Sequence, residues 1–531
     1  MGTMELTLGR WLLTFLPIAV LLVTIVGLKW GAPKAGAAAW FVALAVAIIG
    51  FGGDAFLVAL ASAKGLSLSI FVLSIIWSSV FLYNVAEQLG APRVIGETLA
   101  RLVADPLLQA LVIAWCFSSF LQGITGFGVP VAVAAPLLII VGVPPVQAAV
   151  MTLIGHSWAV TFGSVGSSYY TLQLVTRLAP EQLAPWMAFS FALPIITCGF
   201  GVAHVQGGVP AMRRAALPVL LAGSVMAVLM WLFAYLGAPQ IASTLPSLVG
   251  CLVLWLVGRS APAVRRVEPP IAGGSMDGPL AGKLGFNAAF LPYYALIGLT
   301  VAGQVPAVKA ALGNVAWGLD YPAYQTSLGY QVLAENLYAK ISLLSHPAPI
   351  IVAAALLSFA YYRLAGFWRP GVGRAAARLT VKQCVPTSVG IAATVMMALI
   401  MNDAGMTTLL AHGIANATGP LFPLLSPFIG VLGCFMTGSN TTSNVMFGAL
   451  QYETARGLGV STVLISAAQS VGGSLGSIVA PAKVLIGAVV VGLTGREGEV
   501  MGRAIPYCLV LVLLVGIQTW LFVYVLFREL T

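Results

Sequence analysis

The chain has 531 residues, of which 60% are hydrophobic and only 8% are charged. Soluble domains carry roughly 25% charged residues, so this composition excludes a soluble protein and predicts an all-α polytopic membrane protein with about 12–14 spans. The net charge of +10 comes from basic residues scattered through the connections, which indicates the positive-inside bias of a protein embedded in a lipid bilayer and not a nucleic-acid-binding face.

The first apolar run, Trp11 to Leu28, is too long for the core of a signal peptide. We expect it to be retained as the first span, with cleavage near Ala37 to Ala39 as the alternative. Further runs of span length follow: Ala37–Phe51, Leu68–Tyr83, Trp186–Val202, Leu217–Tyr235, Leu248–Val257, Ala288–Thr300, Pro347–Tyr362, Ser388–Met401 and Tyr507–Phe527. Shorter runs punctuated by Gly and Pro lie between them, which is typical of re-entrant hairpins and broken helices.

The whole chain, 1–531, reads as a single transmembrane transporter domain. We expect a first half at 37–257, a cytoplasmic linker at 258–286 and a second half at 287–531. The two halves are predicted to be inverted repeats, because interrupted segments occur at corresponding places in both of them.

Basic residues predict the orientation of the chain. The stretches Arg213–Arg214, Arg259–Lys283 and Arg363–Lys382 are successively separated by two spans, so all of them can lie on the cytoplasmic side. The connection 302–346 then lies outside, with Tyr321, Tyr324 and Tyr330 as interface anchors.

The repeat rests on two pairs of segments. FLQGITGFGVPVAV (Phe120–Val133) is similar to FMTGSNTTSNVMFGA (Phe435–Ala449), and GVPPVQAAVMTLIGHS (Gly142–Ser157) is similar to GVSTVLISAAQSVGGS (Gly459–Ser474). Each copy ends in a small-residue tract, FGSVGSS or GGSLGS. Chance similarity between Gly-rich membrane segments is the alternative explanation.

The most informative segment is TGSNTTSN, Thr437 to Asn444, which interrupts an apolar stretch. Unsatisfied hydroxyl and backbone groups are costly in hydrocarbon, so these residues are expected to line a wet cavity or to be buried in protein. Gly438 allows a backbone reversal, and a helix beginning near Asn444 would direct free N–H groups at an anion. The candidate binding residues are Thr437, Gly438, Ser439, Asn440, Thr441, Ser443 and Asn444. A helix-packing face is the alternative.

The matching segment of the first half is GITGFGVP, which begins at Gly123. Its glycines and Pro130 predict the tip of a hairpin, and a plain helix kink is the alternative. The candidate binding residues are Gly123, Thr125, Gly126, Phe127 and Gly128.

Further polar groups follow each tip. Gln469 and Ser470 interrupt an apolar run in the second half, and His156 and Ser157 occupy nearly the equivalent positions in the first half. We expect these residues to complete the cavity, although a membrane histidine can also be a satisfied core residue. Lys483 either snorkels to the interface or faces an anionic substrate.

Two carboxylates, Asp54 and Asp403, lie in apolar surroundings. Each is a candidate for proton coupling, as is His156, and helix capping is the alternative for Asp403. The six cysteines stand singly without metal-ligand spacing, and the chain has no H-E-x-x-H motif, no nucleophile elbow and no phosphate-binding loop. We therefore expect no metal, no cofactor, no enzyme activity and no ATP-driven pump.

The motifs FLQGITGFGVPVAV, GCFMTGSNTTSNVMFGALQ, AAQSVGGSLGSIVAP and VVGLTGREGEV resemble those of the bacterial L-lactate permeases, from about Trp77 to the C-terminus. The resemblance implies proton-linked uptake of lactate, glycolate or a similar 2-hydroxymonocarboxylate across the inner membrane. Three positions depart from the family pattern. Gln122 replaces an acidic residue, Gly476–Ser477 lacks a motif lysine, and Lys483 adds one downstream.

We therefore expect a symporter of a short 2-hydroxymonocarboxylate and a proton. The rearranged charges leave other small organic anions open, including sulfonate-bearing acids. Sodium-coupled symport and a passive anion channel are the remaining alternatives, and the oligomeric state is left open.

Overall fold

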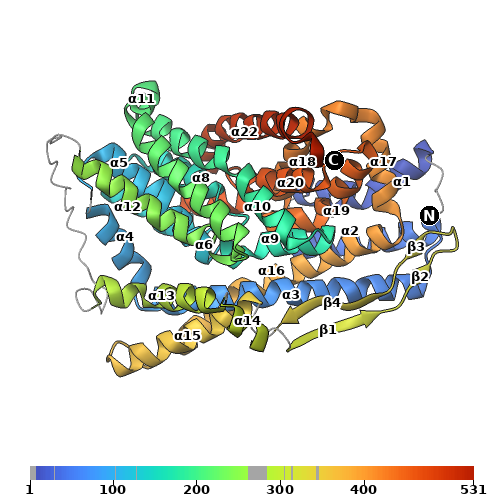
Figure 1. Ribbon diagram of the computed structural model, residues 1–531, viewed down its shortest axis with the longest axis horizontal. Helices are drawn as coiled ribbons and strands as arrows, with labels where there is room; N and C mark the ends of the chain where they lie inside the picture. Colours follow the sequence, from blue (N-terminus) through green and yellow to red (C-terminus); the bar gives the residue numbers. More distant parts are fainter. Residues whose placement is uncertain are drawn as a thin grey trace.

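The computed structural model describes residues 7–28, 30–101, 103–126, 128–260, 284–303, 305–312, 315–342 and 346–530, and most of them are helical (Figure 1). The α-helices are α1 (Leu8–Leu22), α2 (Ala32–Phe51), α3 (Ala55–Gln88), α4 (Ala91–Arg101), α5 (Pro106–Leu111), α6 (Ser118–Ile124), α7 (Val129–Ile140), α8 (Pro145–Ser157), α9 (Gly163–Thr176), α10 (Pro180–Ser190), α11 (Ala192–Tyr235), α12 (Thr244–Ser260), α13 (Phe286–Gly303), α14 (Pro306–Leu312), α15 (Pro347–Leu364), α16 (Val372–Asp403), α17 (Met406–Thr418), α18 (Phe422–Thr437), α19 (Asn440–Leu458), α20 (Thr462–Gly476), α21 (Pro481–Val490) and α22 (Glu497–Leu521). Short π-helical or 3₁₀ turns are η1 (Val23–Gly27), η2 (Val112–Phe117), η3 (Pro239–Ile241), η4 (Gly419–Leu421), η5 (Phe522–Leu526) and η6 (Arg528–Leu530).

The described residues contain 11 helical segments long and apolar enough to cross a bilayer, or 12 if the pair Pro145–Ala159 and Gly163–Thr176, bent by 51°, counts as one span. This agrees with the lower end of the expected number and confirms the polytopic α-helical class. The helices exist because their apolar runs satisfy every backbone group internally, as a bilayer requires.

Three apolar cores hold the described helices together. The first is built mainly from α1–α3, α15–α17 and α19, and the second from α4–α13 and α20–α22. A smaller third core joins α18, α19, α20 and η5. Helices α3 and α16 pack along each other through much of their length. The six cysteines lie buried as single residues.

The expected basic connections gather at one end of the molecule. Helix α11 bends at Gly207–Gly208. In Figure 1 the outer part of α11, the C-terminal end of α12 and the C-terminal end of α15 lie at the left, while β2 and β3 lie at the right. The positive-inside rule predicts that the left end is cytoplasmic. Most of the predicted linker, residues 261–283, lies outside the described residues.

The connection 302–346 contains strands that the sequence did not indicate. β1 (Ala316–Tyr321) pairs antiparallel with β4 (Glu335–Ser342), and β2 (Tyr324–Gln325) pairs with β3 (Gln331–Val332). Strand β4 packs against α3. Tyr321 is not the interface anchor that we expected, because it is buried and its hydroxyl lies 2.6 Å from Ser67 Oγ of α3.

Four helix breaks fall in the interrupted segments that define the sequence repeat. They separate α6 from α7, α8 from α9, α18 from α19 and α20 from α21. Gly155 of α8 and Gly472 of α20 occupy equivalent repeat positions, and both lie against backbone: an added Cβ would approach the carbonyl oxygen of Ala114 to 1.8 Å and that of Pro427 to 1.9 Å. The two halves thus use the same close helix packing, while their inverted relation stays a prediction.

Candidate functional site

A cavity of about 230 Å³ lies where the helix breaks meet. At ~30 Å³ for each water in the liquid, this space would hold roughly eight water molecules. Its lining combines small polar residues with a few apolar ones, namely Ile76, Gln122, Gly126, Gly128, Val160, Ser164, Ser167, Ser168, Thr387, Ile391, Thr437, Gly438, Ser439, Asn440, Thr441, Ala482, Lys483 and Ile486. The cavity therefore accommodates a small polar solute.

The break between α18 and α19 forms one wall. Gly438 adopts φ +73°, which a residue with a side chain rarely does. Ser439 then caps α19 by accepting the N–H of Thr442 at 3.3 Å. The helix begins at Asn440 and not near Asn444, so the predicted start was wrong by one turn. The backbone N–H groups of Asn440 and Thr441 are therefore the ones without an intrahelical partner.

A hydrogen-bonded network behind this wall fixes the tip. The amide of Asn440 donates to Thr161 Oγ1 at 2.9 Å, and the amide of Asn444 donates to Ser470 Oγ and to the Ser168 carbonyl, both at 2.9 Å. Thr161 and Ser168 belong to the first half of the chain, and the other residues belong to the second. The two halves are therefore joined by side-chain hydrogen bonds directly beside the cavity.

Several predicted site residues lie in this supporting layer and do not line the cavity. Gln469 donates to Ser443 Oγ at 3.1 Å, and Ser474 Oγ donates to the Ser157 carbonyl at 2.6 Å. His156 is fully buried, with Nδ1 2.6 Å from the carbonyl oxygen of Thr152. The expectation that His156, Ser157, Gln469 and Ser470 complete the cavity wall is therefore corrected, because α8 and α20 lie behind the broken ends.

The tip of the first half contributes less than expected. Gly126 and Gly128 line the cavity, and Gly128 (φ +80°) begins α7. Gly123 packs instead against α12, where an added Cβ would lie 2.4 Å from Thr244 Oγ1, and Thr125 is buried without lining the cavity. Phe127 lies outside the described residues.

Sequence reasoning missed a strained turn at the start of α9. Ser164, Val165 and Gly166 have φ of 47°, 56° and 82°, and Ser164 lines the cavity. Left-handed conformations of non-glycine residues persist where the surrounding fold imposes them, and they cluster at functional sites. The signal was the FGSVGSS tract, which the repeat comparison noted without assigning it to the site. Gln122 also lines the cavity, although the sequence analysis noted it only as a departure from the family pattern.

Lys483 supplies the charge. Its side chain is buried and lines the cavity, and it is the one charged group among the described lining residues. The snorkelling alternative is therefore excluded. The first turns of α7, α19 and α21 also face the cavity, and each helix N-terminus carries partial positive charge. The electrostatics of the site favour an anion.

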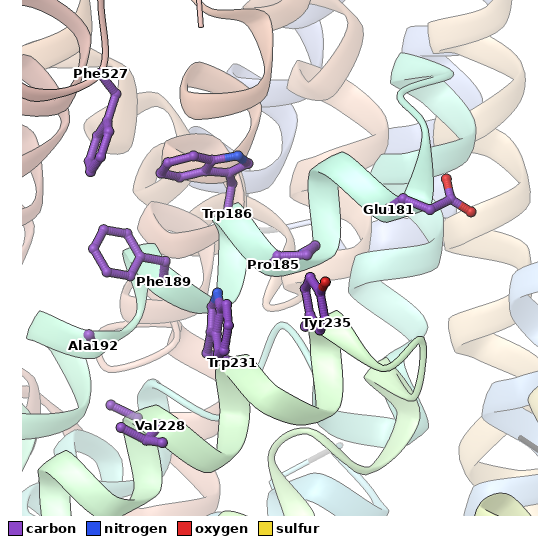
Figure 2. A pocket seen from close by; sticks show the side chains of 10 residues that line it. Glu181, Pro185, Trp186, Phe189, Ala192, Val228, Trp231, Tyr235 and Phe527 are labelled. Atoms are coloured by element: carbon purple, nitrogen blue, oxygen red, sulfur yellow. The ribbon is translucent and has the colours of Figure 1, made fainter.

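A larger cavity, of about 600 Å³, lies elsewhere and lacks this chemistry. Figure 2 shows aromatic side chains around it, including Trp186, Phe189, Trp231 and Phe527, and Glu181 at its edge. This crevice is mostly apolar, and no cationic side chain stands among its described lining residues.

Neither predicted acidic residue lines the binding cavity. Asp54 is exposed and caps α3, and the Leu57 N–H that it accepts at 2.8 Å holds the pKa of its carboxyl below the ordinary value. Asp54 therefore serves as the N-cap of α3, and its part in proton coupling stays a prediction. Asp403 ends α16 and is buried in an ion pair with Lys64.

Broken membrane helices that enclose a small polar cavity are typical of membrane transporters, and the chain belongs to that class. The particular family follows from comparison with known proteins. Residues 10–526 match the family model described as L-lactate permease, and the chain belongs to that family. It is thus a multi-pass protein of the bacterial inner membrane.

Characterised relatives cover most of the chain. The L-lactate permease of Escherichia coli K12 is 28% identical over 469 residues, which are 85% of this chain and 84% of that protein. The glycolate permease GlcA of the same organism is 27% identical over 97% of this chain and 96% of its own length. The L-lactate permease of Bacillus subtilis is 28% identical over 84% of each chain.

Two solved transporter structures show partial likeness. The YdaH transporter of Alcanivorax borkumensis aligns with a TM-score of 0.44 and 16% identity, over 86% of each chain. MtrF of Neisseria gonorrhoeae, described as illuminating a class of antimetabolite efflux pumps, aligns with a TM-score of 0.39 and 14% identity, over 97% of this chain and 95% of its own.

Proposed function

We propose that the protein imports a short 2-hydroxymonocarboxylate, such as lactate or glycolate, together with a proton. The observation that carries the proposal is the cavity with Lys483 as its charged lining residue. The family relationship supports the substrate class, because relatives covering most of the chain are named for L-lactate or glycolate.

The substrate carboxylate would bind Lys483 Nζ and the free N–H groups at the start of α19. Small hydroxyl-bearing residues that line the cavity, including Ser167 and Thr441, offer partners for the 2-hydroxyl group. The size of the cavity limits the substrate to a small acid. A sulfonate of similar size carries the same charge and is the main competitor.

Coupling to one proton makes transport of a monoanion electroneutral. An electroneutral carrier responds to a pH gradient and avoids the ~2.3 kcal/mol per charge that each 100 mV of membrane potential imposes.

Sodium coupling is the second candidate, and one observation favours it. The side-chain oxygens Asn440 Oδ1 and Asn444 Oδ1 are buried without a hydrogen-bond partner among the described residues, and amide oxygens are suitable ligands for a hard cation. Sodium dependence of uptake at constant pH would favour this candidate over proton coupling.

Uptake by the purified protein in proteoliposomes tests the proposal. Labelled L-lactate should accumulate when the outside is made acidic and should respond little to an imposed voltage. Glycolate should compete, and 2-hydroxyethanesulfonate at equal concentration should compete more weakly. Uptake that follows voltage but ignores a pH step would show that the proton scheme is wrong.

Saturable counterflow decides between a carrier and a passive channel. A carrier loaded with unlabelled lactate draws in labelled lactate transiently above equilibrium, and a channel does not.

A further inference from the structure

A buried charge cluster lies outside the binding cavity. Lys64 Nζ of α3 is 2.8 Å from Glu335 Oε2 of β4 and 2.9 Å from Asp403 Oδ2 at the end of α16. Arg177, directly after α9, pairs with the other carboxylate oxygen of Glu335. Two cations and two carboxylates give the cluster a formal charge of zero. Sequence reasoning had singled out Asp403 alone.

The members differ strongly in exposure. The exposed fraction is 1% for Lys64, 2% for Asp403, 12% for Glu335 and 55% for Arg177. Unpaired charge is costly to bury and far less costly near solvent. The position of the uncompensated cation therefore decides which carboxylate accepts a proton more easily.

Protonation of Glu335 is the less costly event. Lys64 would keep Asp403 as its partner, and the unpaired charge would stand on the half-exposed Arg177. Protonation of Asp403 would instead leave two cations to share Glu335, with the excess charge partly on the buried Lys64. The geometry therefore favours Glu335 over Asp403 as the proton acceptor.

The surrounding groups do not change this balance. The groups that face the cluster from neighbouring elements are Tyr338 of β4, whose ring centroid is 5.5 Å from Lys64 Nζ, Asn402 of α16, Tyr330 between β2 and β3, and Glu453 of α19. Glu453 lies 3.7 Å from Arg456, which offsets its charge.

Helix α9 connects the cluster to the cavity. Its strained first turn, Ser164–Gly166, and the adjoining Ser168 contribute to the cavity wall or its support. Arg177 follows its last turn, about 14 Å from Ser168 at the rise of 1.5 Å per residue. The Arg177–Glu335 pair thus ties the far end of α9 to β4, and neutralising Glu335 releases that tie.

We propose that Glu335 binds the co-transported proton, with Lys64 and Asp403 as its buried counter-charges and Arg177 as the link to α9. A proton from outside adds to the Glu335 carboxylate, the Arg177 pair opens, and α9 is free to move with the loaded cavity. The proton leaves to the inside when the pair forms again. This inference rests on the proposed proton symport and identifies its coupling group.

Glu335→Gln tests the inference, because glutamine resembles protonated glutamic acid in shape and charge. Accumulation driven by a pH step should fall by about tenfold or more, while lactate counterflow at equal pH on both sides should stay within about twofold of the parent protein. Glu97→Gln, which removes a carboxylate of α4 that pairs with Arg93 away from the cluster, should leave both measurements unchanged.

The outcomes separate the two proposals. A parent protein that ignores the pH step contradicts proton symport, and the inference falls with it. If the parent and Glu335→Gln accumulate lactate equally in response to the pH step, proton symport stands and only the role of Glu335 is overturned. Loss of counterflow in a correctly inserted Glu335→Gln variant also overturns that role alone. If Glu335→Gln does not insert, Glu335→Asp decides: the pH profile of uptake should shift, whereas Glu97→Asp should not shift it.

Discussion

Replacing Lys483 by methionine tests the binding site most directly. Methionine keeps most of the volume of the lysine stem and removes the charge that distinguishes this cavity from the rest of the buried polar network. The variant should insert normally, because Lys483 is a buried cation with no carboxylate partner among the described residues, and removing it relieves a desolvation cost.

The expected magnitude follows from the enclosed position of Lys483. Two opposite charges ~4 Å apart attract by about 4 kcal/mol at an effective dielectric constant of about 20. Desolvation of the anion and the lysine offsets part of this attraction, which leaves about 2–3 kcal/mol. At 1.4 kcal/mol per decade, the half-saturating lactate concentration should rise about 30- to 140-fold.

The assay is initial uptake of labelled lactate into proteoliposomes over a wide range of concentrations. Lys483→Arg, which keeps the charge, should remain within about tenfold of the parent. Lys382→Met is the matched control, because Lys382 is an exposed lysine of α16, and it should change nothing. A Lys483→Met variant that saturates within threefold of the parent would refute the anion site at the cavity.

Three further substitutions address the scaffold of the site. Asn440→Ala removes the donor to Thr161 Oγ1 and should lower uptake at least about tenfold with normal insertion, measured by quantitative blotting of membranes. Gly438→Leu imposes a side chain at φ +73° on the cavity wall and should abolish uptake, and activity in either variant equal to the parent would mean that the site is misplaced. Gly472→Ala would bring a Cβ to 1.9 Å from the Pro427 carbonyl oxygen. The folded protein should lose about 1–3 kcal/mol of stability, and its thermal midpoint should therefore fall. An unchanged midpoint would contradict the packing argument.

Much of the fold could be predicted because a bilayer imposes one solution on an apolar chain. Long apolar runs must satisfy their backbone groups within helices, so composition and run length identified a polytopic helical protein. The polar segment Thr437–Asn444 was identified as a helix break for the same physical reason, and the structure places that break at Gly438.

Other features depended on contacts between distant residues. The strands of 302–346 carry no clear alternation of polar and apolar residues, and they form because β4 packs on α3. The roles of His156 and Gln469 could not be predicted from the polarity of their neighbours in the sequence. A buried polar residue that lines a cavity and one that supports the cavity wall can stand in the same kind of local sequence.

The order of apolar and polar residues was enough to predict the class of protein, the helix breaks and an isolated lysine near the last break. Tertiary structure decided that Lys483 faces the cavity, because α21 packs against α7 of the other half. It also joined Lys64, Glu335 and Asp403, which come from three different elements that lie far apart in the chain. Ion pairs of this kind leave no local pattern, since their energy depends on burial and distance in the folded protein and not on spacing in the sequence.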